Sequence, residues 1–185
     1  QIIMVLIIED FFSFKTSALG AGATISDAVL SLYCPSKGNA LGSPDVHICA
    51  STQTDANNIV VGDYSRLGTT SFSNISYASL STSAYNDFTL NASGISNISK
   101  TGVSKFGTKS NWDITGTPPE WSSNKLASVV IYYADNGSNK PKLVVTYTSV
   151  VGPANVKTYK GLAAASVKTC KGLAVASIKT KKGLN

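Results

Sequence analysis

The chain contains a single histidine, and the residues around it are the most direct candidates for chemistry. Asp45, His47 and Cys49 alternate along an apolar run, so in a β-strand they would share one face, about 7 Å apart. A carboxylate, an imidazole and a thiol can bind zinc or form a thiol–histidine pair. The alternative is a plain strand in which Val46 and Ile48 point into the core and the three polar side chains face solvent or a loop. We favour the plain strand, with no metal and no cofactor.

Other catalytic patterns are sparse. One histidine leaves few Ser-His-Asp or zinc arrangements open. The only glutamates are Glu9, beside an apolar run, and Glu120, in a proline-rich loop, so paired carboxylates for glycoside hydrolysis are hard to find. The ten acidic residues are scattered and contain no calcium-loop motif. Gly20 and Gly22 precede a strand-like run instead of a helix, which argues against a phosphate-binding loop. The sequence indicates a protein that is not an enzyme.

Two tryptophans offer a binding alternative. Trp112 and Trp121 flank the Pro118–Pro119 loop, and exposed aromatic rings can stack on sugar rings. Burial of both indoles in a β-sheet core is the competing interpretation. Trp112 and Trp121 are therefore our candidate sugar platform.

The chain has three cysteines, too few for a disulfide-rich scaffold. Cys34 and Cys49 end and begin two strand-like runs on either side of a Gly/Pro loop, which predicts that they face each other within disulfide distance. Cys170 occupies a repeat position that holds Tyr159 and Lys181 in the other copies, so a thiol is not required there.

The last thirty residues repeat with a period of eleven and carry much of the positive charge. The copies read VKTYKGLAAAS (156–166), VKTCKGLAVAS (167–177) and IKTKKGLN (178–185). The repeated positions, which we predict to carry assembly, are Lys157, Gly161, Leu162, Lys168, Gly172, Leu173, Lys179, Gly183 and Leu184. Residues 155–185 hold seven lysines and no acid, whereas residues 1–154 hold nine basic and ten acidic groups. The net charge of +6 therefore comes from the tail.

A glycine in every repeat and the β-branched residue before each Lys-Thr pair favour strands over a helix. We expect three-residue turns such as Tyr159-Lys160-Gly161, with strands of about eight residues between them. Strands this poor in large apolar residues need neighbours to complete a core. A flexible basic tail is the alternative.

Residues 1–154 have the length of one domain and are rich in serine, threonine, asparagine and glycine. Strand-like runs separated by turn signals predict a β-sandwich, and Ala92–Lys100 is the one candidate helix. An Asn-Gly pair at Asn136 predicts a hairpin between the last two runs. The runs are 2–8, 11–15, 23–33, 45–51, 58–61, 87–91, 104–108, 127–133 and 142–148.

The segments FSFKTSALGAGATISDAVLSLY, YNDFTLNASGISNISKTGVSKFGT and PKLVVTY resemble the opening, middle and final strands of DNRLRE-type jelly-roll domains. This resemblance spans residues 11–148. It implies an all-β fold, a jelly-roll-like antiparallel β-sandwich, with a short C-terminal β-repeat tail. Such domains are similar to carbohydrate-binding modules and occur in bacterial surface proteins and phage structural proteins. The eleven-residue tail repeat also resembles repeats that end some phage and environmental bacterial proteins.

We therefore expect a sandwich domain over 1–154 and a basic repeat tail over 155–185. The leading hypothesis is a non-catalytic structural subunit of an extracellular or virion surface assembly, a fibre, filament or decoration protein, whose partners are other copies of itself. The alternative is a carbohydrate-binding adhesion module that recognises cell-surface glycans through the body and anchors through the basic tail. A nucleic-acid partner ranks third, because the tail has one aromatic residue for stacking on bases. Ile2–Ile8 is too short to span a bilayer and is expected to form a strand of its own sheet, with completion of a neighbouring copy's sheet as the alternative.

Overall fold

The computed structural model describes residues 9–120 and 122–149, together with the backbone of four short segments in the tail, 158–159, 162–163, 169–170 and 173–174. The strand expected at Ile2–Ile8 and the domain boundary expected at residue 154 lie outside the described residues.

The described body is mostly β, with three antiparallel sheets and only short helices. Its strands are β1 (Asp10–Lys15), β2 (Thr24–Tyr33), β3 (Ser36–Asn39), β4 (Val46–Ala50), β5 (Ser73–Ile75), β6 (Tyr85–Thr89), β7 (Val103–Ser110), β8 (Ala127–Val130) and β9 (Lys142–Thr148). The short helices are η1 (Ser17–Leu19), η2 (Val61–Arg66), η3 (Tyr77–Ser79), α1 (Ala92–Ser96) and α2 (Asn111–Thr115). The four-stranded sheet has the order β1-β7-β4-β5, the three-stranded sheet β6-β2-β9, and β3 pairs with β8.

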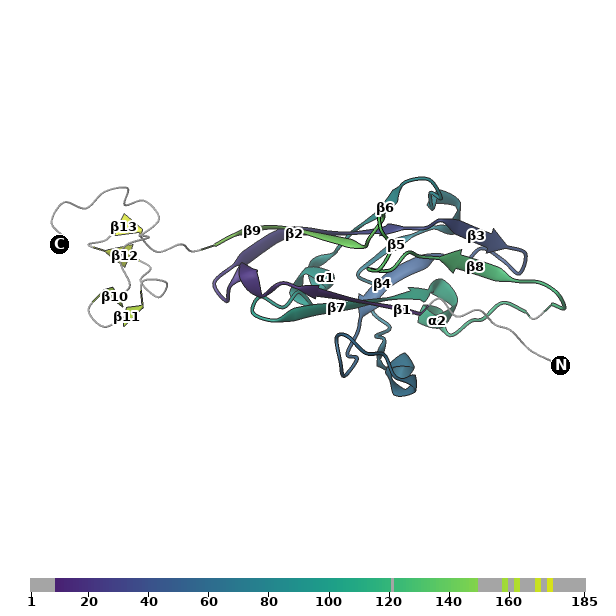
Figure 1. Cartoon of the computed structure of the whole chain (residues 1–185), viewed down its shortest axis with the longest axis horizontal. Coiled ribbons are helices and arrows are strands. Elements are labelled where there is room, and N and C mark those ends of the chain that lie inside the picture. Colours follow the sequence, from purple (N-terminus) through teal and green to yellow (C-terminus); the bar gives the residue numbers. More distant parts are fainter. Residues whose placement is uncertain are drawn as a thin grey trace.

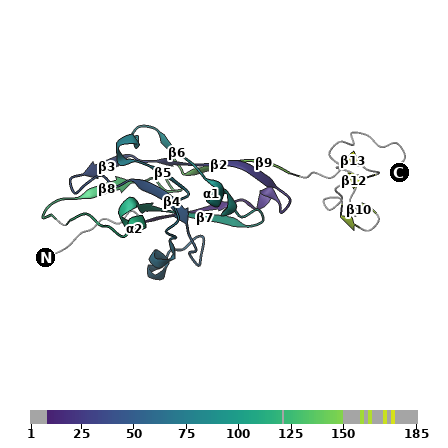
Figure 2. The ribbon, with the colours of Figure 1, turned by 180° about the vertical axis from the view of Figure 1, so that it is seen from behind.

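The two larger sheets lie on either side of one hydrophobic core (Figure 1, and from behind in Figure 2). Alternation along each strand explains this, since every second side chain of a strand points to the same face. The four-stranded sheet contributes Phe12, Ile48 and Phe106 to the core, and the three-stranded sheet contributes Leu30 and Phe88. Burial of each such side chain stabilises the fold by about 1.5–3 kcal/mol.

Strands β8 and β9 pair with the consecutive strands β3 and β2. β8 pairs with β3, β9 pairs with β2, and the Tyr132 amide donates to the Tyr33 carbonyl at 3.0 Å between them. The hairpin predicted from Asn136-Gly137 is therefore wrong, because β8 and β9 do not pair with each other. Gly137 also lacks the positive φ that a tight Asn-Gly hairpin turn needs.

Side-chain caps fix the two α-helices. The Asn91 side chain accepts from the Gly94 amide at 3.0 Å and starts α1, and the Ser110 hydroxyl accepts from the Asp113 amide at 3.2 Å and starts α2. Gly116 ends α2 in the left-handed region, with φ 67°. α1 falls inside the predicted segment Ala92–Lys100, whereas α2 was not predicted.

Candidate functional site

The histidine lies in a hydrogen-bond chain that leads to serine. His47 Nδ1 lies 2.8 Å from Ser71 Oγ, and the Ser71 hydroxyl donates to the Ser73 carbonyl at 3.2 Å. The imidazole tautomer decides whether His47 Nδ1 donates to Ser71 Oγ or accepts from it. Burial lowers the pKa of His47, opposed by Asp45, so the ring is neutral at pH 7. This arrangement ties the residues before β5 to the histidine of β4.

The thiol and carboxylate beside His47 are engaged elsewhere. Asp45 accepts from the Tyr77 amide at 2.9 Å. Cys49 is fully buried, unlike the solvent- or loop-facing position we expected, and its thiol donates to the Gly107 carbonyl at 3.5 Å. Burial raises the pKa of Cys49 to about 11, which disfavours the thiolate that a metal or a nucleophilic reaction requires. Among the described residues, no group of three His, Cys, Asp or Glu side chains could hold a metal ion.

Both cysteines of the predicted disulfide are free and buried. Cys34 follows β2 and donates to the Ser36 carbonyl at 3.3 Å, whereas Cys49 lies within β4 of the other sheet. The prediction of a bond between Cys34 and Cys49 is therefore wrong in this structure. Their strands are not neighbours, because β3 and β4 each pair with a different partner.

Of the two tryptophans in the candidate sugar platform, the structure describes one. Trp112, in α2, is partly buried, and its ring lies so close to Gly42 that a Cβ there would sit 3.1 Å from it. That contact occupies part of the indole. Trp121 lies outside the described residues, so its place relative to Trp112 stays a prediction.

Three tyrosines instead gather on the outer face of the three-stranded sheet. Tyr33 and Tyr132 stack with ring centroids 5.6 Å apart, and Tyr85 meets Tyr33 edge-on at 5.7 Å. The Lys142 ammonium lies 3.7 Å from the centre of the Tyr85 ring. The strand pattern that predicted β2 also places Tyr33 on its outer face. Pairing of β2 with β6 brings Tyr85 opposite it, and the bond from the Tyr132 amide to the Tyr33 carbonyl brings Tyr132 beside it.

The segment between β4 and β5 forms a closed loop, visible as the blue segment below the sheets in Figure 1. The Thr52 amide donates to the Arg66 carbonyl at 3.1 Å, and Ser51 pairs with Leu67 in an isolated bridge. We call residues 52–66 the Ω-loop, because its ends meet while its middle folds on itself. The sequence predicted a strand at 58–61, which is wrong, since η2 and its approach occupy this segment.

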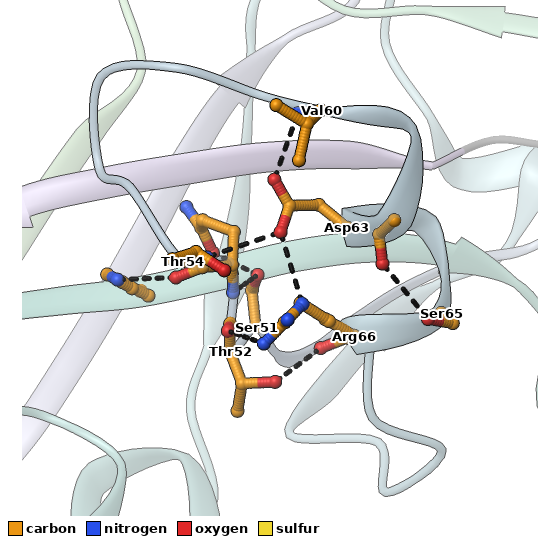
Figure 3. A network of polar contacts seen from close by, with 10 residues as sticks. Ser51, Thr52, Thr54, Val60, Asp63, Ser65 and Arg66 are labelled. Carbon is orange, nitrogen blue, oxygen red and sulfur yellow. Dashed lines mark hydrogen bonds and ion pairs between the residues drawn. The ribbon is translucent and has the colours of Figure 1, made fainter.

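A buried carboxylate organises the interior of the Ω-loop (Figure 3). Asp63 is fully buried, accepts from the amides of Val60 at 3.0 Å and Thr54 at 3.2 Å, and pairs with Arg66 at 3.3 Å. The Val60 amide is the largest cause of the lowered pKa of Asp63, which burial opposes and Thr54 and Arg66 support. The carboxylate is therefore ionised at neutral pH, and its bonds hold the loop backbone in one shape.

The Ω-loop is also fixed to the outer face of the four-stranded sheet. Leu67, directly after it, packs on Gly107 of β7, where any Cβ would overlap the leucine. The Lys105 ammonium donates to the Gln53 carbonyl at 2.6 Å, and the Tyr64 ring meets Phe11 edge-on at 6.2 Å. These contacts attach the Ω-loop to the sheet, from which it projects.

The apex of this projection is apolar and exposed. Ile59, Val60, Val61 and Tyr64, which we call the loop patch, all rank among the exposed large hydrophobic residues, and Val61 is 88% exposed. In the sequence these residues appear only as a short apolar run, which is also typical of a buried strand. The polar residues on both sides, which close the loop, distinguish the two cases. An exposed apolar group on a rigid support is a typical interaction site.

The tail repeats form matching local pairs. β10 (Thr158–Tyr159) pairs with β11 (Leu162–Ala163), and β12 (Thr169–Cys170) pairs with β13 (Leu173–Ala174) in the same register. Tyr159 pairs with Leu162, so it is a strand residue and not part of a three-residue turn as predicted. The predicted eight-residue strands fall largely outside the described residues. So do most predicted assembly positions, namely Lys157, Gly161, Lys168, Gly172, Lys179, Gly183 and Leu184.

Comparison of the chain with protein-family models, curated proteins and solved structures finds no match. Within residues 9–120 and 122–149, no helix is long and apolar enough to cross a bilayer. A proposal for function rests on the geometry described above.

Proposed function

We propose that this chain is a non-catalytic structural subunit of an extracellular or virion surface assembly, a fibre, filament or decoration protein. Its body is a jelly-roll-like sandwich, and it self-associates through its terminal segments. The observation that carries the proposal is the pairing in the tail, where two successive repeats adopt the same register eleven residues apart. A repeat that recurs in structure as well as in sequence is a unit for stacking.

The energetics of these pairs favour assembly. A two-stranded hairpin with two residues per strand is not stable alone in water, so its leucine and alanine side chains need a neighbouring surface. Seven lysines repel one another within one tail, which favours contacts that leave their ammonium groups in solvent or near acids of other copies. The bodies have a net charge close to zero and add no such repulsion.

Deletion of residues 155–185 tests the proposal. The truncated protein should stay folded and soluble but no longer assemble, as measured by sedimentation velocity beside the full chain. A matched full-length variant, Leu162→Ser/Leu173→Ser/Leu184→Ser, keeps every lysine and should also lose assembly. If the truncated protein forms the native oligomer, the tail is not the assembly element. If only the truncation fails to assemble, charge and not the apolar repeat drives association.

A second candidate function is a carbohydrate-binding adhesion module with a basic anchoring tail. The observation that favours it is the cluster of Tyr33, Tyr85 and Tyr132 on an outer sheet face, because tyrosine combines an apolar ring with a polar hydroxyl. Residues 1–154 should then bind on a glycan array, and Tyr132→Ala should abolish the signal while the far-UV spectrum stays unchanged. The absence of binding to any glycan by the folded body would remove this candidate.

A further inference from the structure

The connection between β8 and β9 contains the chain's single Asn-Gly pair, Asn136-Gly137. The backbone does not require a glycine there, because Gly137 has no positive φ and a Cβ at this position would meet no atom within 4 Å. The pair has a chemical property instead. The backbone nitrogen after an asparagine is the nucleophile nearest to the side-chain carbonyl carbon, and a glycine leaves that nitrogen unshielded.

Two backbone amides hold the Asn136 side chain. The Ser138 amide donates to Asn136 Oδ1 at 3.1 Å, and the Asn139 amide donates to the same oxygen at 2.9 Å. Because both neighbours are donors, the atom that they meet is the carbonyl oxygen and not the side-chain nitrogen. The two bonds fold the carboxamide over the residues that follow it, which directs its carbonyl carbon toward the Gly137 nitrogen.

We propose that Asn136 is a self-modification site, at which the chain converts the Asn136 amide into a carboxylate without an enzyme. The Gly137 amide loses its proton to hydroxide, and its nitrogen attacks Asn136 Cγ. The side-chain nitrogen takes a proton from water and leaves as ammonia, so that a five-membered succinimide ring remains. Water then adds to either ring carbonyl and opens the ring to aspartate or isoaspartate. The net change is the addition of water and the loss of ammonia, with no oxidant or cofactor.

The two donor amides act where negative charge develops. Oδ1 carries this charge in the tetrahedral intermediate, and the amides of Ser138 and Asn139 stabilise it as the donors of an oxyanion hole do. No hydrogen bond within residues 9–120 and 122–149 uses the Gly137 amide as a donor, so its proton is available to hydroxide. Gly137 and Ser138 are both exposed, and water reaches the reacting atoms.

Contacts on both sides keep this geometry in place. Before the pair, the Tyr133 hydroxyl donates to Asp10, and the Asn136 amide donates to the Tyr133 carbonyl at 3.2 Å. After the pair, the Tyr85 hydroxyl donates to the Lys140 carbonyl at 3.1 Å. The connection is fixed at both ends, so the two donor amides are in position before the reaction starts. An unfolded chain has the same Asn-Gly pair without these donors.

The reaction changes the charge and the backbone of this connection. Aspartate at position 136 places a second acid beside Asp135. Residues 1–154, with nine basic groups, then hold eleven acidic groups instead of ten, so their net charge changes from −1 to −2. Isoaspartate also inserts an extra carbon atom into the backbone between β8 and β9. This inference does not depend on the proposed self-association.

Peptide mass spectrometry of the full chain during incubation at pH 8 and 37 °C tests the proposal. We expect the peptide that contains Asn136 to gain the mass of amide-to-acid conversion over days to weeks, as a mixture of aspartate and isoaspartate. Asn39, which is exposed and followed by Ala40, is the control in the same chain and should keep its amide. The chain unfolded in guanidinium chloride should convert Asn136 about tenfold more slowly, less than the effect of about 10²–10³ for one donor in a closed active site, because the connection is exposed to water.

Two full-length variants separate the nucleophile from the donors. Gly137→Ala fits the backbone but shields the nitrogen, and should lose most of the product. Ser138→Pro removes one of the two donors and should slow conversion by about threefold to tenfold with the Asn-Gly pair intact. Circular dichroism shows whether each variant is folded, and the comparison with the unfolded parent chain needs neither of them. A folded chain that keeps the Asn136 amide, or that converts it no faster than the unfolded chain or than Asn39, would overturn the inference and leave the proposed function untouched.

Discussion

Substitution of one glycine probes the attachment of the Ω-loop. Gly107 lies in β7, paired with Phe11 on one side and Cys49 on the other. A Cβ at this position would overlap Leu67 Cδ2 and lie 2.8 Å from the Asp10 carbonyl oxygen. The leucine can move only by giving up its burial, and the carbonyl can move only by disturbing the β1–β7 pairing. Gly107→Ala therefore has no relaxed solution.

The cost can be bounded from these contacts. Forced overpacking costs about 1–3 kcal/mol, and a backbone neighbour that cannot yield places this case near the upper end, at about 2–3 kcal/mol. For a chain of this length each kcal/mol corresponds to about 2–4 °C in Tm, so we expect a fall of about 4–12 °C.

Thermal and urea unfolding followed by circular dichroism measures this change. Gly22→Ala is the matched control, because its Cβ would meet no atom within 4 Å, and it should change stability by less than about 1 kcal/mol. In a double-mutant cycle, Gly107→Ala with Leu67→Ala should cost less than the sum of the two single changes, because the second substitution removes one of the clashes. If Gly107→Ala is as stable as Gly22→Ala, Leu67 does not pack on the sheet and the loop is not fixed as described.

Three further predictions concern titrating groups. Burial raises the pKa of Asp10, so the stability that its protonated form contributes is complete below pH 3.8 and is lost as pH rises through the raised pKa. Asp10→Asn does not titrate and should therefore gain stability relative to the parent between pH 4 and 7 in urea titrations. A difference in stability that stays constant over this pH range would contradict the prediction. The pKa of Asp63 is lowered, so the stability that its carboxylate contributes is present above pH 3.8 and is lost on acidification. Asp63→Asn should expose residues 52–66 to limited proteolysis at pH 7, and an unchanged cleavage pattern would count against the role of Asp63 in holding the loop. Cys34 and Cys49 are buried with raised pKa values, so iodoacetamide at pH 7.5 should leave both unmodified until the protein is unfolded, and rapid labelling of either, detected by mass spectrometry, would show that the core is open.

The sequence predicted best where alternation and length agreed. The run 142–148 coincides with β9, and 23–33 contains β2, because each alternates apolar residues over seven or more positions. β3 and β5 were not predicted, because they are short and polar and show no alternation of apolar residues. Their pairing with β8 and β4 stabilises them. Pairing between distant segments is not visible in local residue types.

The errors at candidate sites have the same origin. The apolar run at 58–61 was interpreted as a buried strand, because local sequence does not show that Asp63 closes the segment into a loop with an exposed apex. Cys34 and Cys49 flank a loop in sequence, yet their strands pair with different partners, so proximity along the chain did not become proximity in space.

Sedimentation velocity of the full chain at micromolar concentration tests the central claim most directly. The account predicts species larger than the monomer, with a distribution that shifts to larger sizes as concentration rises, because association between copies follows mass action. A single monomeric boundary that is independent of concentration would contradict the proposal that this protein is a self-associating structural subunit.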